Sequence, residues 1–228
     1  MNKQEYVSLG IRLCKELVEL VPIISHTDHY EGRENAKAIE KDWISRVHST
    51  FNFEGETAKV LTPERDDRFW TDFAIIYKEE FFPFNFKSGV GGTKDNISGL
   101  KYLRYLIFYD LDKEYNLKSI TEEKLAKDII KLKKGEISFN ETNRDYFCVA
   151  YNIRSGNIKI IPISCIKSED LATNPKNLFQ ADFHNADFEI NRTLRESVDF
   201  IIEKFIEYNK KRAKPYLSFR EAGIVSYG

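Results

Sequence analysis

Apolar residues recur every three or four positions in several stretches of the chain, which is the spacing of one face of an amphipathic helix. These stretches predict helices over residues 3–20, 34–47, 96–107, 121–134 and 189–212. Asn96 is a suitable cap for the third of them, and Gly135 closes the fourth. In the second, Glu40 lies three residues before the inward-facing Trp43, so its carboxylate borders the buried face. That is a costly position for an unpaired charge.

Shorter apolar runs, rich in β-branched and aromatic residues, have the length and composition of strands. They predict strands over residues 72–77, 81–87, 145–153 and 157–165. The charged turn 78–80 joins the first two, and the turn 154–157 joins the last two. A Gly-rich loop over 88–95 follows the second strand, and the polar stretch 174–185 is expected to be a loop. This order predicts an α/β domain with a central mixed β-sheet flanked by helices.

The length of the chain, 228 residues, suits a single domain. It divides into N-terminal helices over 1–50, a core over about 51–165, and a C-terminal loop and helix over 166–228. The 35 basic and 36 acidic side chains nearly balance. This balance excludes a globally basic nucleic-acid binder, although a cleft can still concentrate positive charge.

Several common kinds of site are disfavoured by the residues. Three cysteines, Cys14, Cys148 and Cys165, lie far apart without a CxxC pair, so they are expected to be reduced and buried. His26 and His29 lack further ligands at zinc spacing, and no GxxxxGK[ST] loop predicts a nucleotide cofactor. The chain shows neither a secretion signal nor an apolar run of membrane-spanning length, which predicts a soluble, cytoplasmic protein with no membrane partner.

A group of polar residues stands out in the second predicted strand and its neighbour. Residues two apart in a strand project from the same face, so Asn85 and Lys87 point one way while Phe84 and Phe86 point the other. Asp72, at the start of the neighbouring strand, can reach the same face as Asn85 and Lys87. A carboxylate, an amide and an ammonium group are therefore expected to converge beside the Gly-rich loop.

Phosphodiester hydrolysis requires such groups. The Asp72 carboxylate and the Asn85 side-chain oxygen can hold Mg²⁺, which prefers oxygen ligands and keeps several waters. The ion lowers the pKa of a bound water and neutralises charge that develops on the phosphate oxygens. Lys87 can position or deprotonate the attacking water and stabilise the transition state.

The pattern Asp72, followed by Asn85-x-Lys87 on the next strand, resembles the signature of the PD-(D/E)xK nucleases, a family that includes many type II restriction endonucleases. The helix that carries Glu40 is similar to the N-terminal helix of those enzymes. Thr71 replaces the proline of the signature, which is a common variation. Asn85 replaces the second acid and so removes one negative charge from the metal site.

The resemblance implies a restriction-endonuclease-like fold, a Mg²⁺ cofactor and hydrolysis of double-stranded DNA at a specific palindromic site by a bacterial homodimer. It implies that Glu40 lies beside the metal and that the main-chain carbonyl of Phe86 is a further metal ligand. The size, the aromatic richness and the order of elements also fit enzymes of this class that cut an A·T-rich palindrome to blunt ends.

The Gly-rich loop and the helix expected after it are the predicted contacts with DNA. The expected DNA-binding residues are Ser88, Thr93, Lys94, Asn96 and Lys101. Among them, Asn96 has the side chain suited to a bidentate contact with adenine in the major groove.

Two alternatives remain open at this point. The first is a repair or junction-resolving nuclease of the same fold, which would cut according to DNA structure. The second is a catalytically inactive DNA-binding module, because the amide at Asn85 removes a metal carboxylate.

Overall fold

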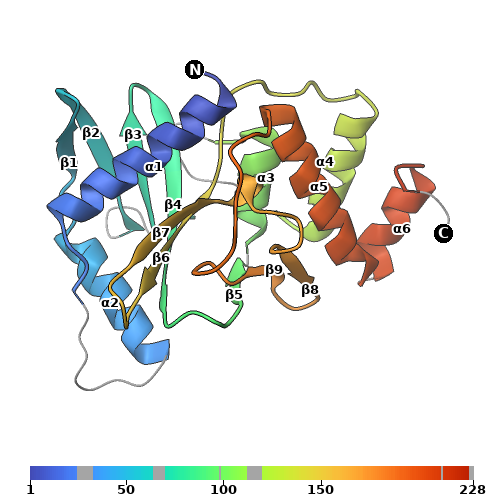
Figure 1. Cartoon of the computed structure of the whole chain (residues 1–228). Coiled ribbons are helices and arrows are strands. Elements are labelled where there is room, and N and C mark those ends of the chain that lie inside the picture. Colours follow the sequence, from blue (N-terminus) through green and yellow to red (C-terminus); the bar gives the residue numbers. More distant parts are fainter. Residues whose placement is uncertain (25–32, 64–69, 98, 112–119, 212, 226–228) are drawn as a thin grey trace.

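The computed structural model describes residues 1–24, 33–63, 70–97, 99–111, 120–211 and 213–225 of the chain. Its main sheet has six strands in the order β1-β2-β3-β4-β6-β7 (Figure 1). The strands are β1 (Thr50–Phe53), β2 (Glu56–Leu61), β3 (Phe73–Tyr77), β4 (Glu80–Gly89), β6 (Phe147–Asn152) and β7 (Ile158–Pro162). β4 and β6 are parallel, and the other neighbours are antiparallel. The predicted mixed sheet is confirmed.

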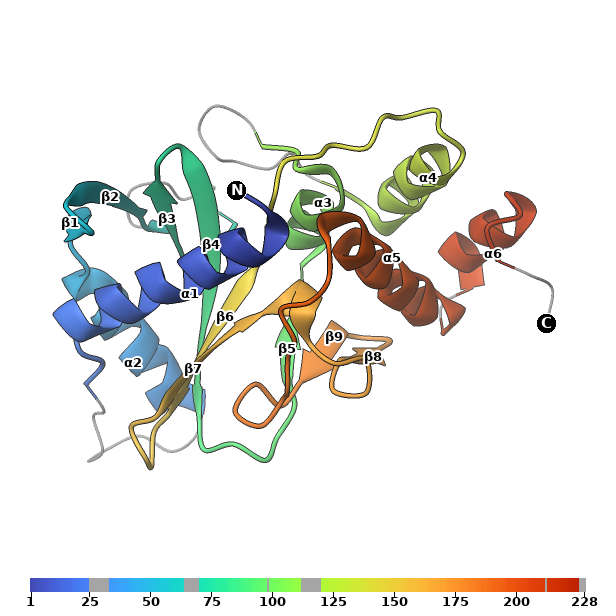
Figure 2. The ribbon, with the colours of Figure 1, turned by 45° about the horizontal axis from the view of Figure 1, so that its top comes forward.

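Helices cover both faces of this sheet. α1 (Lys3–Leu20) and α2 (Arg33–Arg46) pack on one face, and Figure 2 shows α1 lying across the strands. α3 (Leu100–Phe108) and α5 (Leu194–Lys210) cover the other face. α4 (Glu122–Lys133) and α6 (Ala213–Glu221) pack against these two helices. None of the described helices is both long enough and apolar enough to cross a membrane.

Strand β4 separates the two halves of the core by the alternation of its side chains. Phe84 and Phe86 are fully buried on the face that α1 and α2 cover. The Trp43 ring of α2 stacks on Phe86 with a centroid distance of 5.4 Å, and Phe73 of β3 stacks on Phe84 at 4.8 Å. Asn85 and Lys87 consequently project to the opposite face, as the strand period requires.

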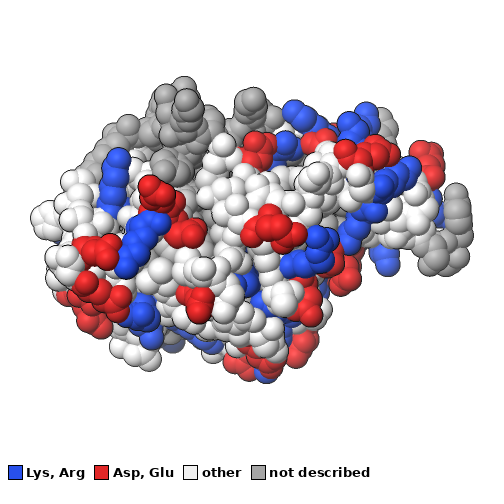
Figure 3. All heavy atoms as spheres, turned by 90° about the horizontal axis from the view of Figure 1, so that it is seen from above, with Lys and Arg blue, Asp and Glu red and all other residues white. Residues whose placement is uncertain are grey.

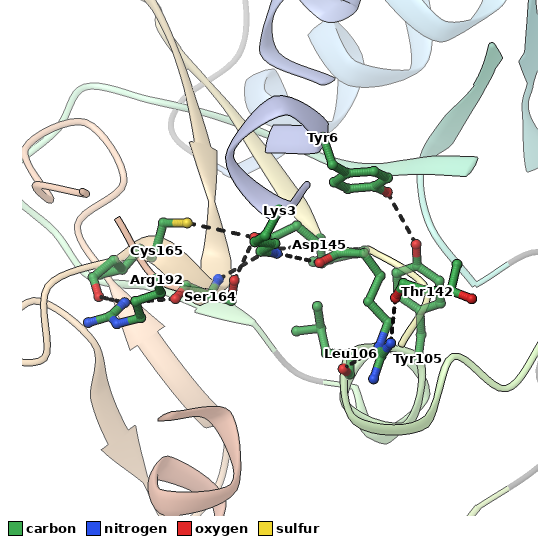
Figure 4. Close-up of polar contacts among 12 residues, drawn as sticks. Lys3, Tyr6, Tyr105, Leu106, Thr142, Asp145, Ser164, Cys165 and Arg192 are labelled. Atoms are coloured by element: carbon green, nitrogen blue, oxygen red, sulfur yellow. Dashed lines mark hydrogen bonds and ion pairs between the residues drawn. The ribbon is translucent and has the colours of Figure 1, made fainter. Parts of the chain in front are cut away.

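A buried polar network fastens the N-terminal helix to the sheet (Figure 4). The Lys3 ammonium donates to the Asp145 carboxylate at 2.7 Å and to the Arg144 carbonyl. Asp145 also accepts hydrogen bonds from the Ser164 amide and hydroxyl. The buried Arg144 guanidinium donates to carbonyls at the end of α3 and in the segment before β6. Each buried charge therefore has partners, as burial of ions demands.

A second, three-stranded sheet corrects two predictions. It has the order β5-β9-β8, from β5 (Asp95–Ile97), β9 (Leu178–Ala181) and β8 (Ala172–Asn174). The expected helix start at Asn96 is wrong, because Asn96 pairs with Gln180 in this sheet and α3 begins after Gly99. The expected loop over 174–185 is wrong in part, because it contains β9. The first error arises from pairing between segments more than 80 residues apart, and the second also from the β8–β9 hairpin, which is local.

Smaller differences concern the ends of elements. The last long helix begins at Leu194 and not near Glu189, because Thr193 and Glu196 form a capping box. The strand expected over 157–165 ends at Pro162 and continues as a turn of 3₁₀-helix. The β1–β2 hairpin and α6 were not predicted. The three cysteines are free and buried, as expected.

Candidate active site

Asp72 lies at the point where β3 stops pairing with β4. Its main-chain amide donates to the Phe84 carbonyl at 3.1 Å, and its carboxylate accepts from the Phe86 amide at 2.6 Å. The hydroxyl of Thr71, which stands at the proline position of the signature, also donates to the Phe84 carbonyl. These bonds hold the Asp72 carboxylate against the edge of β4, next to Asn85.

The same edge presents a main-chain oxygen. The amide and carbonyl of one strand residue leave toward the same side, and the Phe86 amide points to Asp72. The Phe86 carbonyl is therefore directed to this edge and away from β6. The second carboxylate oxygen of Asp72 makes no hydrogen bond with any residue that the structure describes.

Asn85 and Lys87 line a cavity of about 220 Å³ on the α3 side of the sheet. The other lining residues are Trp70, Asn96, Ile97, Gly99, Lys101, Tyr102 and Tyr146. The Tyr146 ring is stacked between Trp70 and Tyr102, with centroid distances of 5.6 Å and 5.0 Å. The polar side chains of β4 thus face a space lined partly by stacked aromatic rings.

Glu40 of α2 is close enough to the site for the Asp72 and Lys87 charges to affect its pKa. Burial and, next, the Asp72 carboxylate raise the pKa of Glu40 to about 7, while Lys87 and Lys37 oppose the rise. Burial also raises the pKa of Asp72, against the opposing effects of Lys87 and the Phe86 amide. Two carboxylates and one ammonium group therefore share a partly dehydrated volume, in which the carboxylates repel each other. Such a site favours an added cation.

The oxygen donors fit magnesium better than a metal that needs many protein ligands. No three His, Cys, Asp or Glu side chains gather in a metal-binding group among the described residues. The donors available are the Asp72 and Glu40 carboxylates, the Asn85 amide and the Phe86 carbonyl. Mg²⁺ is commonly held by one or two carboxylates and keeps several waters, so this set is sufficient for it.

The predicted DNA-binding residues separate into three groups. Asn96 and Lys101 line the cavity together with Asn85 and Lys87. Thr93 and Lys94 are exposed in the loop between β4 and β5. Ser88 instead donates to the Ala36 carbonyl of α2 at 3.1 Å, so its hydroxyl links strand and helix.

Two residues near the site were not singled out in the sequence. Tyr146 precedes β6, and its raised pKa reflects burial and, next, the Asp72 charge. Asp95 of β5 is half-buried; burial raises its pKa, while Lys87 and then His184 oppose the rise. Both are brought to the site by strand pairing across long sequence distances, which leaves no local signal. His26 and His29 lie outside the described residues.

Basic side chains near the cavity come from separate elements. Lys87 belongs to β4, Lys101 to α3 and Lys94 to the connection between β4 and β5. On the face seen from above in Figure 3, by contrast, basic and acidic side chains are interspersed over a mostly uncharged surface. The β4–β5 connection runs along the bottom of Figure 1, away from that face.

The sequence matches no protein-family model and no curated protein.

Proposed function

We propose that the chain is a magnesium-dependent endonuclease of the PD-(D/E)xK kind that hydrolyses phosphodiester bonds in double-stranded DNA. The observation that carries this proposal is the arrangement of Asp72. The Phe86 amide holds its carboxylate at the open edge of β4, beside Asn85 and Lys87 and coupled to Glu40. The mixed sheet with helices on both faces is compatible with a restriction-endonuclease-like fold.

Each protein group has a separate task in this proposal. Asp72, Asn85 and the Phe86 carbonyl would hold Mg²⁺. The Glu40 carboxylate would add a second negative charge beside the ion. When bound, the ion lowers the pKa of a water and screens the phosphate charge. The Lys87 ammonium orients the attacking water and stabilises negative charge on the phosphate oxygens in the transition state. Without the ion, burial and the Asp72 charge raise the pKa of Glu40 to about 7. A bound cation favours the ionised carboxylate, which is the form that adds negative charge to the site.

The finer proposal is a type II restriction endonuclease that acts as a homodimer at a palindromic, A·T-rich site and leaves blunt ends. A duplex palindrome has two-fold symmetry, so two copies of the site are needed to cut both strands at equivalent bonds. Asn85 is neutral where the signature has a second acid, so the site lacks one negative charge. The Glu40 carboxylate supplies a negative charge nearby, which supports the proposal.

The test is digestion of a long natural DNA with Mg²⁺. Asp72→Ala and Lys87→Ala should each reduce cleavage by roughly 10²- to 10³-fold or more while the fold is retained. Lys59→Ala, in an exposed position of β2, and Asp187→Ala, in an exposed loop position, are the matched controls and should cut normally. Full activity of the Lys87→Ala variant would contradict the proposed nuclease site.

The pattern of fragments separates the alternatives. Discrete bands with mapped blunt ends indicate a restriction enzyme. Cleavage confined to branched or damaged DNA indicates a structure-specific nuclease. DNA binding without cleavage in either Mg²⁺ or Mn²⁺ indicates an inactive binding module.

A further inference from the structure

A row of three carboxamide side chains crosses the small sheet from one edge strand to the other. Gln180 of β9 donates through Nε2 to the Asn96 Oδ1 of β5 at 2.6 Å. Asn174 of β8 donates through Nδ2 to the Gln180 Oε1 at 3.1 Å. The Lys176 main-chain amide donates to the Asn174 Oδ1 at 2.9 Å and ends the row. The hydrogen bonds all run in one direction, so the orientation of each amide is set by its neighbour.

The row lies on the face of the small sheet that points away from the core. Ile97 and Phe179 alternate with the amides and are buried in the cluster that includes α5. Thr173 is also buried and donates to Glu207 of α5 at 2.8 Å. Since neighbouring strand residues point to opposite faces, Asn96, Gln180 and Asn174 face outward. Asn96 is exposed, and the other two amides are half-buried.

The row begins at the candidate active site. Asn96 lines the same cavity as Asn85 and Lys87, and β5 follows β4 after a short loop. In Figures 1 and 2 the small sheet lies on the side of the molecule where this β4–β5 connection runs. A molecule whose phosphate reaches Lys87 can therefore extend over the row.

The hydrogen-bonding groups of Asn96 that remain unused in the row match the edge of adenine. Within the described residues, the Asn96 Nδ2 makes no hydrogen bond, and its Oδ1 has a second lone pair after accepting from Gln180. One carboxamide can donate to adenine N7 while it accepts from the N6 amino group. The major groove is wide enough to admit a β-ribbon. Exposed Lys94 and Lys176 lie near the two ends of the row, where phosphates on either side of a groove would need positive charge.

We infer that the row formed by Asn96, Gln180 and Asn174 reads A·T base pairs in the major groove beside the phosphate that is cut. This inference rests on the proposed nuclease function, because it takes the cavity as the place of the reacting phosphate. Asn96 contacts the base edge directly, and Gln180 acts mainly by fixing the orientation of the Asn96 amide. The amide row is thus the sequence-selective part of the site, whereas the lysines contribute affinity without base choice.

The experiment is a binding selection from a random duplex pool with the full chain carrying Asp72→Ala, so that cleavage is not needed for the readout. The bound sequences should show adenine at defined positions. Adding Asn96→Ala or Gln180→Ala should reduce that preference on the order of tenfold at one or two positions. The salt dependence of binding should stay unchanged, because no phosphate contact is lost. Gln4→Ala on α1, which changes the other glutamine of the chain, is the matched control and should leave the preference intact.

The outcomes are separable from those of the cleavage test. If the unsubstituted chain cuts DNA at defined sites but both amide variants retain the full adenine preference, the row is not the reader and the nuclease proposal stands. If the chain binds A·T-rich DNA but never cuts, and the variants lose the preference, the row is supported and the nuclease proposal fails. Absence of any DNA binding overturns both. If Gln180→Ala lowers the melting temperature strongly, Asn96→Ala decides, because Asn96 is exposed at an edge strand.

Discussion

At the scale of single residues, the candidate site depends on a few groups whose properties come from their surroundings. Asp72 is held by a main-chain amide of the strand that carries Asn85 and Lys87. Glu40 belongs to a helix on the opposite face, yet the Asp72 carboxylate is, after burial, the main cause that raises its pKa to about 7. The sequence predicted Asp72, Asn85 and Lys87 from the motif, and the resemblance to the nuclease family added Glu40. It did not predict the sharing of charge between them.

The raised pKa of Glu40 leads to a prediction about stability in the absence of metal. The pKa in the folded protein, about 7, lies above the ordinary value of 4.5, so the folded state binds more protons than the unfolded state between these pH values. The free energy of unfolding should therefore fall as pH rises from about 4.5 to 7. Glu40→Gln imitates the protonated group, so this variant should melt at a higher temperature than the unsubstituted chain at pH 8 but at the same temperature below about pH 4.5.

Thermal unfolding of the two proteins in a chelator, followed across this pH range, measures the difference. Glu34→Gln, an exposed change on the same helix, serves as the control for the general effect of removing a charge. Equal melting temperatures for Glu40→Gln and the unsubstituted chain at pH 8 would contradict the buried, repelled carboxylate.

At the scale of elements, local patterns predicted most helices and the central strands. They were wrong where pairing between distant segments determined the secondary structure. The helix period placed α1, α2 and α4 within a few residues, because their apolar faces and caps are local. The stretch after the Gly-rich loop has helical spacing from Ile97 onward, but pairing of β5 with β9 places Asn96 and Ile97 in a strand. Local spacing alone does not distinguish these outcomes for a short segment.

The packing of α1 against the sheet gives a second prediction. An added methyl group at Gly10 would lie 2.5 Å from the ring of Phe147 and 2.9 Å from that of Phe82. Helix propensity favours alanine over glycine by about 1 kcal/mol, but overpacking costs about 1–3 kcal/mol. Because both rings are fully buried, we expect the overpacking to dominate and Gly10→Ala to be destabilising. Urea unfolding measures the change, and a stabilised variant would show that the helix can move away from the sheet.

At the scale of the whole molecule, a buried ion pair joins the N-terminal helix to the segment that enters the central sheet. The Lys3–Asp145 pair links the first turn of α1 to the residue before Tyr146, which lines the candidate site. The two partners are 142 positions apart in the chain and both are buried. The network therefore helps to fix the position of α1 relative to the sheet and to the segment that enters the cavity wall.

Removal of one partner from this pair should be strongly destabilising. Lys3→Met leaves the Asp145 carboxylate buried without its cation, which costs about 3–5 kcal/mol and lowers the melting temperature by about 10 °C. Arg12→Ala removes the exposed ion pair with Glu54 and is the matched control, with an expected change below about 1 kcal/mol. Calorimetry measures both, and similar melting temperatures for the two variants would contradict a structural role of the buried pair.

The sequence by itself determined the class of fold and the alternation of β4, and it predicted Asp72, Asn85 and Lys87 as the candidate group. These features follow from the periods of helices and strands, which are properties of neighbouring residues. Only the tertiary structure decided that Glu40 acts on Asp72, that Tyr146 and Asp95 lie at the site, and that Asn96 joins Gln180 and Asn174 in one row of amides. Apart from the Gln180–Asn174 bond within one hairpin, each of those relations depends on contacts between distant segments, and their energies do not appear in any local pattern.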